Sequence, residues 1–394
     1  MSKLRIAIIG AGVVGLSIAR SLALRGAKVT LFERDWVGAG TSSTTYAWVN
    51  SNGKSPLSYH QLNVEGMEEH RRLQAQCPTQ GRWLDECGTY EWASGSDHTA
   101  RLKARVEALQ AKGYPAIAAK HEDIAALLPE LLLPSPTEDI WSFPSESLLC
   151  PSIFLGFLCS EARKLGVVLE QRQEVTGIDE HDHAITLHLG SNKRWEGDLA
   201  VSAVGRWTQR LASFLGKSIA MINADQPDKI GCGFLGYTSP LRVQLRSNLI
   251  TPEINIRPEG GGRLLLQVPD LDHLANPAYR TPPDAMVGRE MLHRLRRVLR
   301  HTADARLERI EVGQRARPAD GRPVVGFLTD RKKLYAVVTH SGMTLAPVLG
   351  NLVAAELVLG ERSPLLAEYG PERLLGKRVE DFQAIETIHY PASQ

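Results

Sequence analysis

A glycine-rich turn between an apolar strand and a helix restricts the fold of this chain more than any other feature. Residues 4–9 (LRIAII) form a short apolar run that is typical of a strand buried on both faces. Residues 10–15 then read GAGVVG, residues 16–24 continue with apolar side chains at helical spacing, and residues 27–32 indicate a second strand. This order of strand, turn, helix and strand predicts a Rossmann-type βαβ unit.

Each glycine of this G-x-G-x-x-G pattern has a physical task. Gly10 permits the tight turn, Gly12 lets a pyrophosphate approach the backbone, and Gly15 lets the helix pack closely on the strand. The helix then begins near Val13 and Val14, where free N–H groups and the positive end of the helix dipole favour phosphate. The segment therefore predicts a dinucleotide-binding site.

The residues after the second strand indicate which nucleotide binds. Glu33 ends that strand, where a carboxylate accepts hydrogen bonds from ribose hydroxyls and repels a 2′-phosphate, so NADP is not expected. Residues 38–45 are small and rich in hydroxyls, and such a loop can close over a pyrophosphate. The expected nucleotide contacts are Gly10, Gly12, Val13, Val14, Gly15, Glu33, Arg34, Gly40, Thr41, Ser42 and Thr45.

Composition excludes several other classes of protein. The chain has 46 basic and 44 acidic residues, and a net charge of +2 argues against a dedicated nucleic-acid binder. Its five cysteines form no C-x-x-C pair, so we expect reduced thiols, no metal site and no redox disulfide. We find no long uncharged apolar stretch and no signal peptide before the first strand, and therefore expect a cytoplasmic protein without a transmembrane segment.

The length and the later sequence predict a second domain. A chain of 394 residues exceeds what one core usually supports. Residues 231–238 and 241–250 have the composition of strands, and residues 259–262 (EGGG) separate two further strand-like runs, which indicates a hairpin. A charged helix is expected over residues 283–300. These elements indicate an antiparallel sheet with at least one helix.

The order of motifs along the chain resembles the D-amino acid oxidase family of flavoproteins. The matching pieces are the glycine-rich turn and residues 40–42, 147–151, 174–175, 203–207, 313–326 and 339–347. The resemblance implies an α/β fold in which a Rossmann-type FAD-binding domain (1–84, 146–210 and 311–394) is interleaved with an α+β substrate domain (85–145 and 211–310) that contains an antiparallel sheet. It also implies oxidation of the C–N bond of an amine or amino acid, namely a D-amino acid, glycine or an N-alkyl amino acid.

The resemblance assigns roles to several residues. Arg315 stands where the family's carboxylate-binding arginine falls, with Arg317 as a displaced alternative, and His340 resembles the family histidine near the flavin. Because the last cysteine is Cys232, the cysteine link that tethers flavin in some relatives is excluded, and FAD is expected to bind non-covalently. The further flavin contacts expected are Val175, Gly205, Trp207, His340, Ser341, Gly342, Met343 and Thr344.

The sequence departs from the family in the region that would bind substrate. Residues 47–56 are unlike those of named members, and Trp48, Asn50 and Lys54 are candidate pocket residues there. Asn255 stands where glycine oxidase has a tyrosine. The substrate is therefore left open, as is the electron acceptor, which is oxygen or a quinone or protein. Two alternatives also remain: a flavin-dependent tRNA-uridine modification enzyme, and a non-catalytic flavin subunit of an amine dehydrogenase complex.

Overall fold

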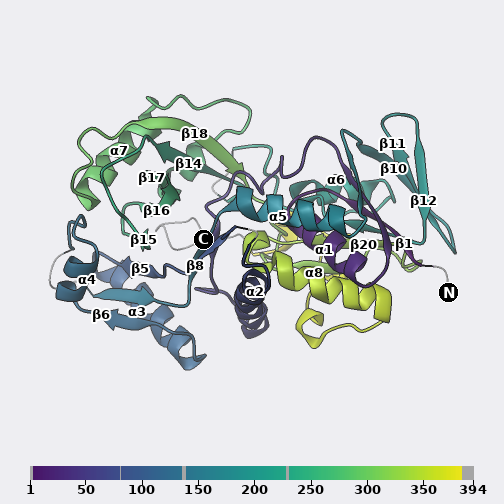
Figure 1. Ribbon diagram of the computed structural model, residues 1–394, viewed down its shortest axis with the longest axis horizontal. Coiled ribbons are helices and arrows are strands. Elements are labelled where there is room, and N and C mark those ends of the chain that lie inside the picture. The colour runs from purple at the N-terminus through teal and green to yellow at the C-terminus, as the bar shows by residue number, and fades with distance from the viewer. Residues whose placement is uncertain (1–2, 80, 135–138, 228–229, 384–394) are drawn as a thin grey trace.

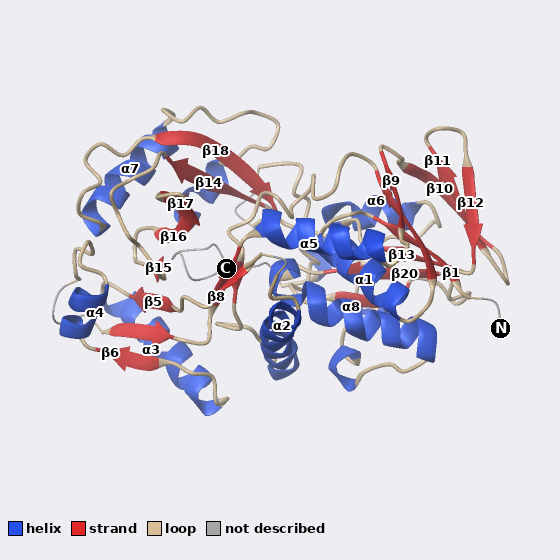
Figure 2. Cartoon of the chain, in the orientation of Figure 1, coloured by secondary structure: helices blue, strands red, loops and turns tan. Residues whose placement is uncertain are grey.

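Two large sheets lie at the two ends of the molecule (Figure 1), and the secondary-structure colouring separates them clearly (Figure 2). The computed structural model describes residues 3–79, 81–134, 139–227 and 230–383. A six-stranded sheet lies on the right of both views and an eight-stranded sheet on the left. Helix α2 (Leu57–Gln76) and the small sheet β3-β8-β4 lie between them. The strands of that small sheet are Trp48–Val49, Ser147–Leu149 and Leu84–Asp85.

The six-stranded sheet has the order β19-β20-β13-β1-β2-β9 and is parallel except for β19 at its edge. Its strands are β1 (Arg5–Ile9), β2 (Lys28–Glu33), β9 (Val168–Gln171), β13 (Leu199–Ser202), β19 (Val324–Phe327) and β20 (Leu334–Val338). The predicted strand, helix and strand at the N-terminus are confirmed, and the helix begins at Val13. The fold is thus the expected Rossmann-type α/β arrangement.

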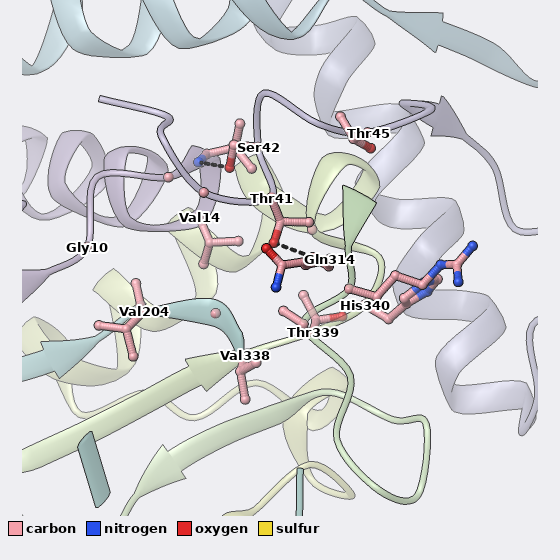
Figure 3. Close-up of a pocket in the computed structure, with 18 of the residues that line it drawn as sticks. Gly10, Val14, Thr41, Ser42, Thr45, Val204, Gln314, Val338, Thr339 and His340 are labelled. Carbon is pink, nitrogen blue, oxygen red and sulfur yellow. Dashed lines mark hydrogen bonds between the residues drawn. The ribbon is translucent and has the colours of Figure 1, made fainter. Parts of the chain in front are cut away.

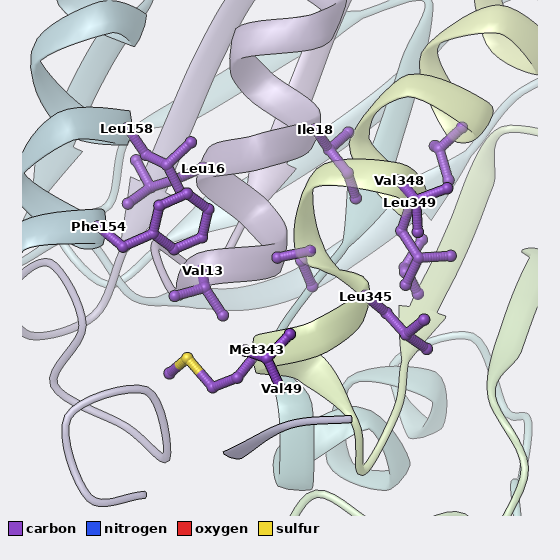
Figure 4. Packing of buried hydrophobic residues seen from close by; sticks show 14 of the residues in the cluster. Val13, Leu16, Ile18, Val49, Phe154, Leu158, Met343, Leu345, Val348 and Leu349 are labelled. Atoms are coloured by element: carbon purple, nitrogen blue, oxygen red, sulfur yellow. The ribbon is translucent and has the colours of Figure 1, made fainter. Parts of the chain in front are cut away.

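Strand β1 is buried on both faces, as its uninterrupted apolar sequence predicted. Ile6 and Ile8 pack against helices α1 (Val13–Leu24), α5 (Pro151–Lys164) and α8 (Gly342–Leu359), whose contacts are drawn in Figure 4. Ala7 and Ile9 point to the opposite face, toward an antiparallel sheet of β10 (Val175–Glu180), β11 (Ile185–Leu189) and β12 (Arg194–Gly197). This alternation follows from the two-residue period of a strand.

Close backbone contacts require glycine at two of the three glycine positions in the G-x-G-x-x-G turn. Gly10 has a φ of +103°, and a Cβ there would lie 2.7 Å from the carbonyl oxygen of Ala203. A Cβ on Gly15 would lie 2.0 Å from the carbonyl oxygen of Gly10. Any larger residue at either position would push helix α1 away from the sheet, and the phosphate-binding turn would lose its shape.

The eight-stranded sheet has the order β18-β14-β17-β16-β15-β5-β7-β6. The hairpin predicted around residues 259–262 is present, but the strand predicted over residues 241–250 is limited to its last three residues. Val243 and Leu245 are buried in the core of this half, so their alternation reflects packing of an irregular segment, not pairing in the sheet. The strands are β5 (Thr89–Trp92), β6 (Ile117–Ala119), β7 (Ile140–Phe143), β14 (Cys232–Thr238), β15 (Asn248–Ile250), β16 (Asn255–Gly260), β17 (Arg263–Gln267) and β18 (Leu307–Gln314).

Three helices lie on the side of the eight-stranded sheet: α3 (Ser96–Ala111), α4 (His121–Leu127) and α7 (Met286–Val298). The short helix α6 (Thr208–Ser213) lies on the side of the six-stranded sheet. Strand β18 crosses the predicted domain boundary at residues 310 and 311, while the other strands of its sheet lie within 85–145 or 211–310. The proposed division into two domains rests on this distribution of strands.

Helix α8 corrects one expectation from the sequence. By length and composition it is apolar enough to cross a membrane, although no such stretch was expected. It packs against α1 and α2, and 61% of the apolar window is buried inside the protein. Because the central helix of a folded domain also passes a test of length and composition, this helix is weak evidence for a membrane span.

Candidate active site

A single elongated pocket connects the glycine-rich turn to the start of helix α8, and Figure 3 shows its central part. The pocket continues to the eight-stranded sheet, where Gly233, Leu235 and Gln267 line it. Most residues predicted from the sequence meet on its wall. They are Gly10, Gly12, Val13, Val14, Glu33, Arg34, Gly40, Thr41, Ser42, Thr45, Trp48, Asn50, Lys54, Val175, Gly205, Trp207, Arg315, His340, Ser341, Gly342, Met343 and Thr344.

Three residues named from the sequence are not on the wall, and one of them is Arg317, the displaced alternative to Arg315. Gly15 lies beneath the turn, where it allows the close contact with Gly10 described above. Asn255 is buried one layer behind the wall, and its amide donates a hydrogen bond of 3.4 Å to Gln267, which does line the pocket. Position 255 therefore acts on the pocket through Gln267, a residue that the sequence gave no reason to select.

At one end of the pocket, Glu33 holds the glycine-rich turn. One carboxylate oxygen accepts a hydrogen bond from Ala11 N (2.8 Å) and the other accepts one from Asp35 N (2.9 Å). Nearby, the guanidinium groups of Arg34 and Arg206 lie 4.4 and 3.7 Å from the ring centroid of Trp207, which is cation–π geometry. This end thus presents an acid, an arginine and an aromatic plane to an adenosine group, and Arg206 packs on that plane. Arg206 was not predicted.

The loop of residues 40–45 lies over the start of helix α1. The Ser42 hydroxyl accepts a hydrogen bond from Val13 N (3.1 Å), and Thr41 donates one to the carbonyl of Gln314 (2.6 Å), as Figure 3 shows. A Cβ on Gly12 would lie 3.0 Å from the Ser42 oxygen. The space between the helix start and this loop is therefore narrow and rich in N–H and O–H groups, which fits the diphosphate of FAD.

The junction between β20 and α8 forms the other wall, and its polar groups are fixed by neighbours. The hydroxyl groups of Tyr59 and Ser341 lie 2.7 Å apart, and His70 is 2.7 Å from the carbonyl of Met343. His340 lines the pocket and is buried, which lowers its pKa well below the usual value, and Arg317, Lys54 and Arg315 lower the pKa further. His340 is therefore a neutral imidazole at neutral pH.

Arg315 is already engaged within the protein. Its Nη2 lies 2.8 Å from the Asp272 carboxylate, and Nη1 donates to the carbonyls of Ile230 (3.1 Å) and Cys232. The side chain of Asp272 is only 2% exposed. Arg315 reaches the pocket wall, but its charge is largely balanced by this carboxylate.

Two other cations near the same end have no such partner. Within the described part of the chain, neither Lys54 nor Arg317 forms an ion pair, and the buried Nε of Arg317 has no hydrogen-bond partner. Burial lowers the pKa of Lys54 to about 8, with a further lowering by Arg317 and a partial increase from Glu146. Burial also lowers the pKa of Arg317.

A buried carboxyl group supports the pocket wall at Trp48. Glu146 accepts hydrogen bonds from Trp48 Nε1 (2.8 Å) and from the Tyr114 hydroxyl (3.0 Å). Burial raises the pKa of Glu146 to about 7. The sequence contained no signal for this group, because Glu146 lies about 100 residues from Trp48 and meets it only through the pairing of β3 with β8.

A dinucleotide cradle of this shape, joined to a buried compartment at the ends of the parallel strands, defines an FAD-dependent oxidoreductase. The chain belongs to the FAD dependent oxidoreductase family (DAO), whose model matches residues 5–356. The family resemblance and the prediction of an enzyme are thereby confirmed.

Three known proteins are similar to this chain over different lengths. Glycine oxidase of Geobacillus kaustophilus is 23% identical over 385 residues, covering 94% of this chain and 97% of that protein. Its crystal structure superposes with a TM-score of 0.81 at 22% identity and covers 95% of this chain and all of the other. The crystal structure of L-proline dehydrogenase from P. horikoshii has a TM-score of 0.80 at 19% identity and covers 94% and 98%. A tRNA 5-methylaminomethyl-2-thiouridine biosynthesis bifunctional protein from Chromohalobacter salexigens is 38% identical, but only over 24% of this chain and 14% of its own length.

Proposed function

We propose that this enzyme oxidises the C–N bond of an amine or amino acid, with FAD as the acceptor of a hydride from the carbon next to nitrogen. The observation that carries the proposal is the continuity of the pocket, in which the dinucleotide cradle opens directly into a compartment lined by Trp48, Lys54 and His340. The similarity to glycine oxidase over nearly the whole chain supports the same reaction class.

The residues of the compartment provide position and charge for this chemistry. His340 is neutral, so it can accept or donate a hydrogen bond without adding a charge beside the reacting amine. The cationic side chains of Lys54 and Arg315 line the same end of the pocket and would attract a carboxylate and hold it in one orientation. The wall at Trp48 is fixed by Glu146 and keeps one side of the compartment apolar.

The individual roles of Arg315 and His340 are also part of the proposal. The sequence predicted that Arg315 anchors the substrate carboxylate, with Arg317 as a displaced alternative. Because Arg315 is paired with Asp272, we propose that this pair positions the wall and that Lys54, which lines the pocket, also contacts the anion. His340 remains the proposed polar contact beside the flavin, because it lines the pocket immediately before α8.

We propose that FAD binds without a covalent bond to cysteine. Each of the five cysteines is a free thiol, and none of them is among the pocket-lining residues. The contacts that would hold FAD are the N-terminus of α1, the loop of residues 40–45 and Glu33. Such contacts are non-covalent, so the cofactor would be released when the protein unfolds.

A substrate panel tests the proposed reaction. The purified holoenzyme is mixed without oxygen with glycine, N-methylglycine, D- and L-amino acids and simple amines, and the absorbance of the oxidised flavin is followed. Loss of the yellow absorbance with an amino acid is the expected result. Reduction by no member of the panel would contradict the proposal and would favour the non-catalytic subunit. Reoxidation by oxygen or by a quinone analogue then identifies the acceptor.

The tRNA-modifying alternative is tested in the same way. Supplying unfractionated bacterial tRNA would bleach the flavin if that activity were present. The balanced charge of the chain argues against it, because a tRNA-binding surface requires an excess of basic residues.

A cytoplasmic location is proposed on the grounds given from the sequence.

A further inference from the structure

A buried primary amide lies on the face of the eight-stranded sheet that borders the pocket. Gln267 is the last residue of β17, is only 6% exposed and lines the pocket. Leu266 before it pairs with Gly236, so Gln267 lies opposite Leu235 of β14, which also lines the pocket. Opposed residues of antiparallel strands point to the same face of a sheet. The amide therefore projects from this face toward the pocket.

The surroundings of this amide are largely apolar. Leu235 packs in one buried cluster with Tyr46, Tyr237 and Leu265. A polar group buried in such surroundings costs free energy unless it has a hydrogen-bond partner. The Gln267 side chain therefore requires partners for both its oxygen and its nitrogen.

Asn255 provides a partner for the oxygen and so orients the amide. The two residues lie opposite each other on β16 and β17, and Asn255 Nδ2 donates a hydrogen bond of 3.4 Å to Gln267 Oε1. The amide nitrogen of Gln267 is then turned away from Asn255. This nitrogen has no hydrogen-bond partner among the described residues and is not sealed from solvent, so it opens onto the pocket. Its two N–H groups are available to a bound molecule.

The neighbouring polar side chains of the wall already have partners within the protein. The Tyr46 hydroxyl and Trp48 Nε1 each donate to a buried side chain. The Asn50 amide is bonded to backbone groups through both its oxygen and its nitrogen. Gln267 thus offers a donor that a substrate can use without breaking a contact inside the protein.

We propose that Gln267 binds the carboxylate of the substrate and that Asn255 positions it for this contact. The inference rests on the proposed oxidation of an amino acid. Gly233 lies two residues from Leu235 on the same face, and the Arg315 guanidinium covers it, because a Cβ there would lie 2.6 Å from Nη2. Gly233 and Gln267 are diagonal neighbours in the sheet. A carboxylate between Arg315 and Gln267 would accept hydrogen bonds from both.

A neutral donor suits this position. The charge of Arg315 is largely balanced by Asp272, and a further cation would cost more to bury than an amide. An amide N–H still forms a charge-assisted hydrogen bond with an anion. The same group also discriminates between substrates, because an amine without a carboxylate leaves the N–H groups of Gln267 unsatisfied.

A non-oxidisable monocarboxylate tests the contact separately from catalysis. The holoenzyme and its Gln267→Met variant are titrated with acetate, and binding is measured by calorimetry or by the change in the visible spectrum of the flavin. We expect the Kd for acetate to rise at least about tenfold in Gln267→Met, as the loss of a hydrogen bond to a charged group would give. Gln267→Glu, which replaces the donors with a carboxylate, should bind acetate no more tightly than Gln267→Met.

The matched control is Gln244→Met, because Gln244 is an exposed glutamine in the same half of the molecule. Its Kd for acetate should equal that of the wild type. Flavin content shows whether each variant is folded. An unchanged acetate affinity in folded Gln267→Met would overturn the proposal.

A cycle of single and double variants tests the positioning role of Asn255. Asn255→Ala leaves the Gln267 amide free to rotate, so the Kd for acetate should rise, but by less than in Gln267→Met. In the double variant Asn255→Ala/Gln267→Met, the Kd should equal that of Gln267→Met alone, because the residue that Asn255 orients is absent. Losses of binding free energy that simply add would overturn this role.

The substrate panel distinguishes failure of this inference from failure of the proposed function. With the amino acid that reduces the flavin fastest, Gln267→Met should lower kcat/KM about tenfold, chiefly through KM. The corresponding amine without the carboxylate should be oxidised no more slowly than by the wild type. Equal losses for both would overturn the inference and leave oxidation of the C–N bond intact. If no amino acid reduces the flavin while acetate binding still depends on Gln267, the carboxylate site stands and the proposed reaction falls.

Discussion

The guanidinium of Arg315 lies 2.8 Å from the carboxylate of Asp272, 43 residues away, in a pair that is 12% and 2% exposed. Gly233 makes room for this pair, because a Cβ there would lie 2.6 Å from Arg315 Nη2 and 2.7 Å from the Asp272 carboxylate. Phe234 N also donates to Asp272 (2.9 Å). The pair links the end of β18, next to Arg315, to the short 3₁₀ helix of Pro269–Leu274, and the hydrogen bond from Phe234 joins β14 to the same carboxylate.

Removal of one member of this pair should destabilise the enzyme. Arg315→Ala would leave the Asp272 carboxylate buried without its counter-ion, which costs on the order of 3–5 kcal/mol of unfolding free energy. Urea denaturation of the wild type and the variant measures the difference. In the double variant Arg315→Met/Asp272→Asn the loss should be smaller, since neither charge remains. A loss below about 1 kcal/mol for Arg315→Ala would mean that water solvates Asp272 instead.

The cofactor should be sensitive to Glu33. Replacing Glu33 with alanine removes the proposed contacts to the ribose as well as the hydrogen bonds to Ala11 N and Asp35 N. Because charge-assisted hydrogen bonds contribute about 1.5–3 kcal/mol each, the Kd for FAD should rise at least about tenfold. Fluorescence titration of the apoprotein measures it. The control is Glu170→Ala, because Glu170 is an exposed acid on β9. Equal affinities for FAD in the two variants would mean that a residue other than Glu33 contacts the ribose.

Denaturation should release the cofactor. When the holoenzyme is precipitated with acid, the yellow colour should stay in the supernatant, since no cysteine lines the pocket. Chromatography of the supernatant should identify FAD. Colour retained in the pellet would demonstrate a covalent bond, and release of NAD would contradict the choice of cofactor.

Glu146 should make the stability depend on pH. Burial raises its pKa from 4.5 to about 7, so folding favours the protonated form. The associated stability is complete below about pH 4.5 and is lost as the pH rises through about 7, by an amount on the order of 3 kcal/mol. Glu146→Gln cannot ionise and should flatten this part of the profile. Thermal unfolding of both proteins between these pH values tests it, and parallel profiles would contradict the shift.

Lys54 should make anion binding depend on pH. Burial and Arg317 lower its pKa to about 8, so its positive charge is lost as the pH rises through that value. The Kd for a non-oxidisable carboxylate such as acetate should therefore increase above about pH 8, while a bound anion should itself raise the pKa of Lys54. Lys54→Arg keeps its charge throughout this range and should show a flat profile. If the Kd of the wild type is equally independent of pH, Lys54 does not contact the bound anion.

Local sequence was a reliable guide where neighbouring residues control the structure. The turn of residues 10–15, the first strands and helix, and the hairpin at residues 259–262 are all present, because turn geometry and apolar periodicity are local properties. The strand expected over residues 241–250 failed for a related reason. Its apolar alternation was real, but most of the segment found no neighbouring strand to pair with.

The sequence by itself determined the nucleotide-binding architecture, since glycine spacing and the acid at position 33 specify a backbone shape that depends on few distant contacts. The class of enzyme followed from the resemblance of its motif order to a known family. Only the tertiary structure decided which charges face the substrate. Asp272 reaches Arg315 from the short helix of residues 269–274, Glu146 reaches Trp48 across a small sheet, and Lys54 lines the pocket without a carboxylate partner among the described residues. Whether a charge is balanced depends on distances of a few ångströms between segments far apart in the chain, and residue spacing along the sequence does not record those distances.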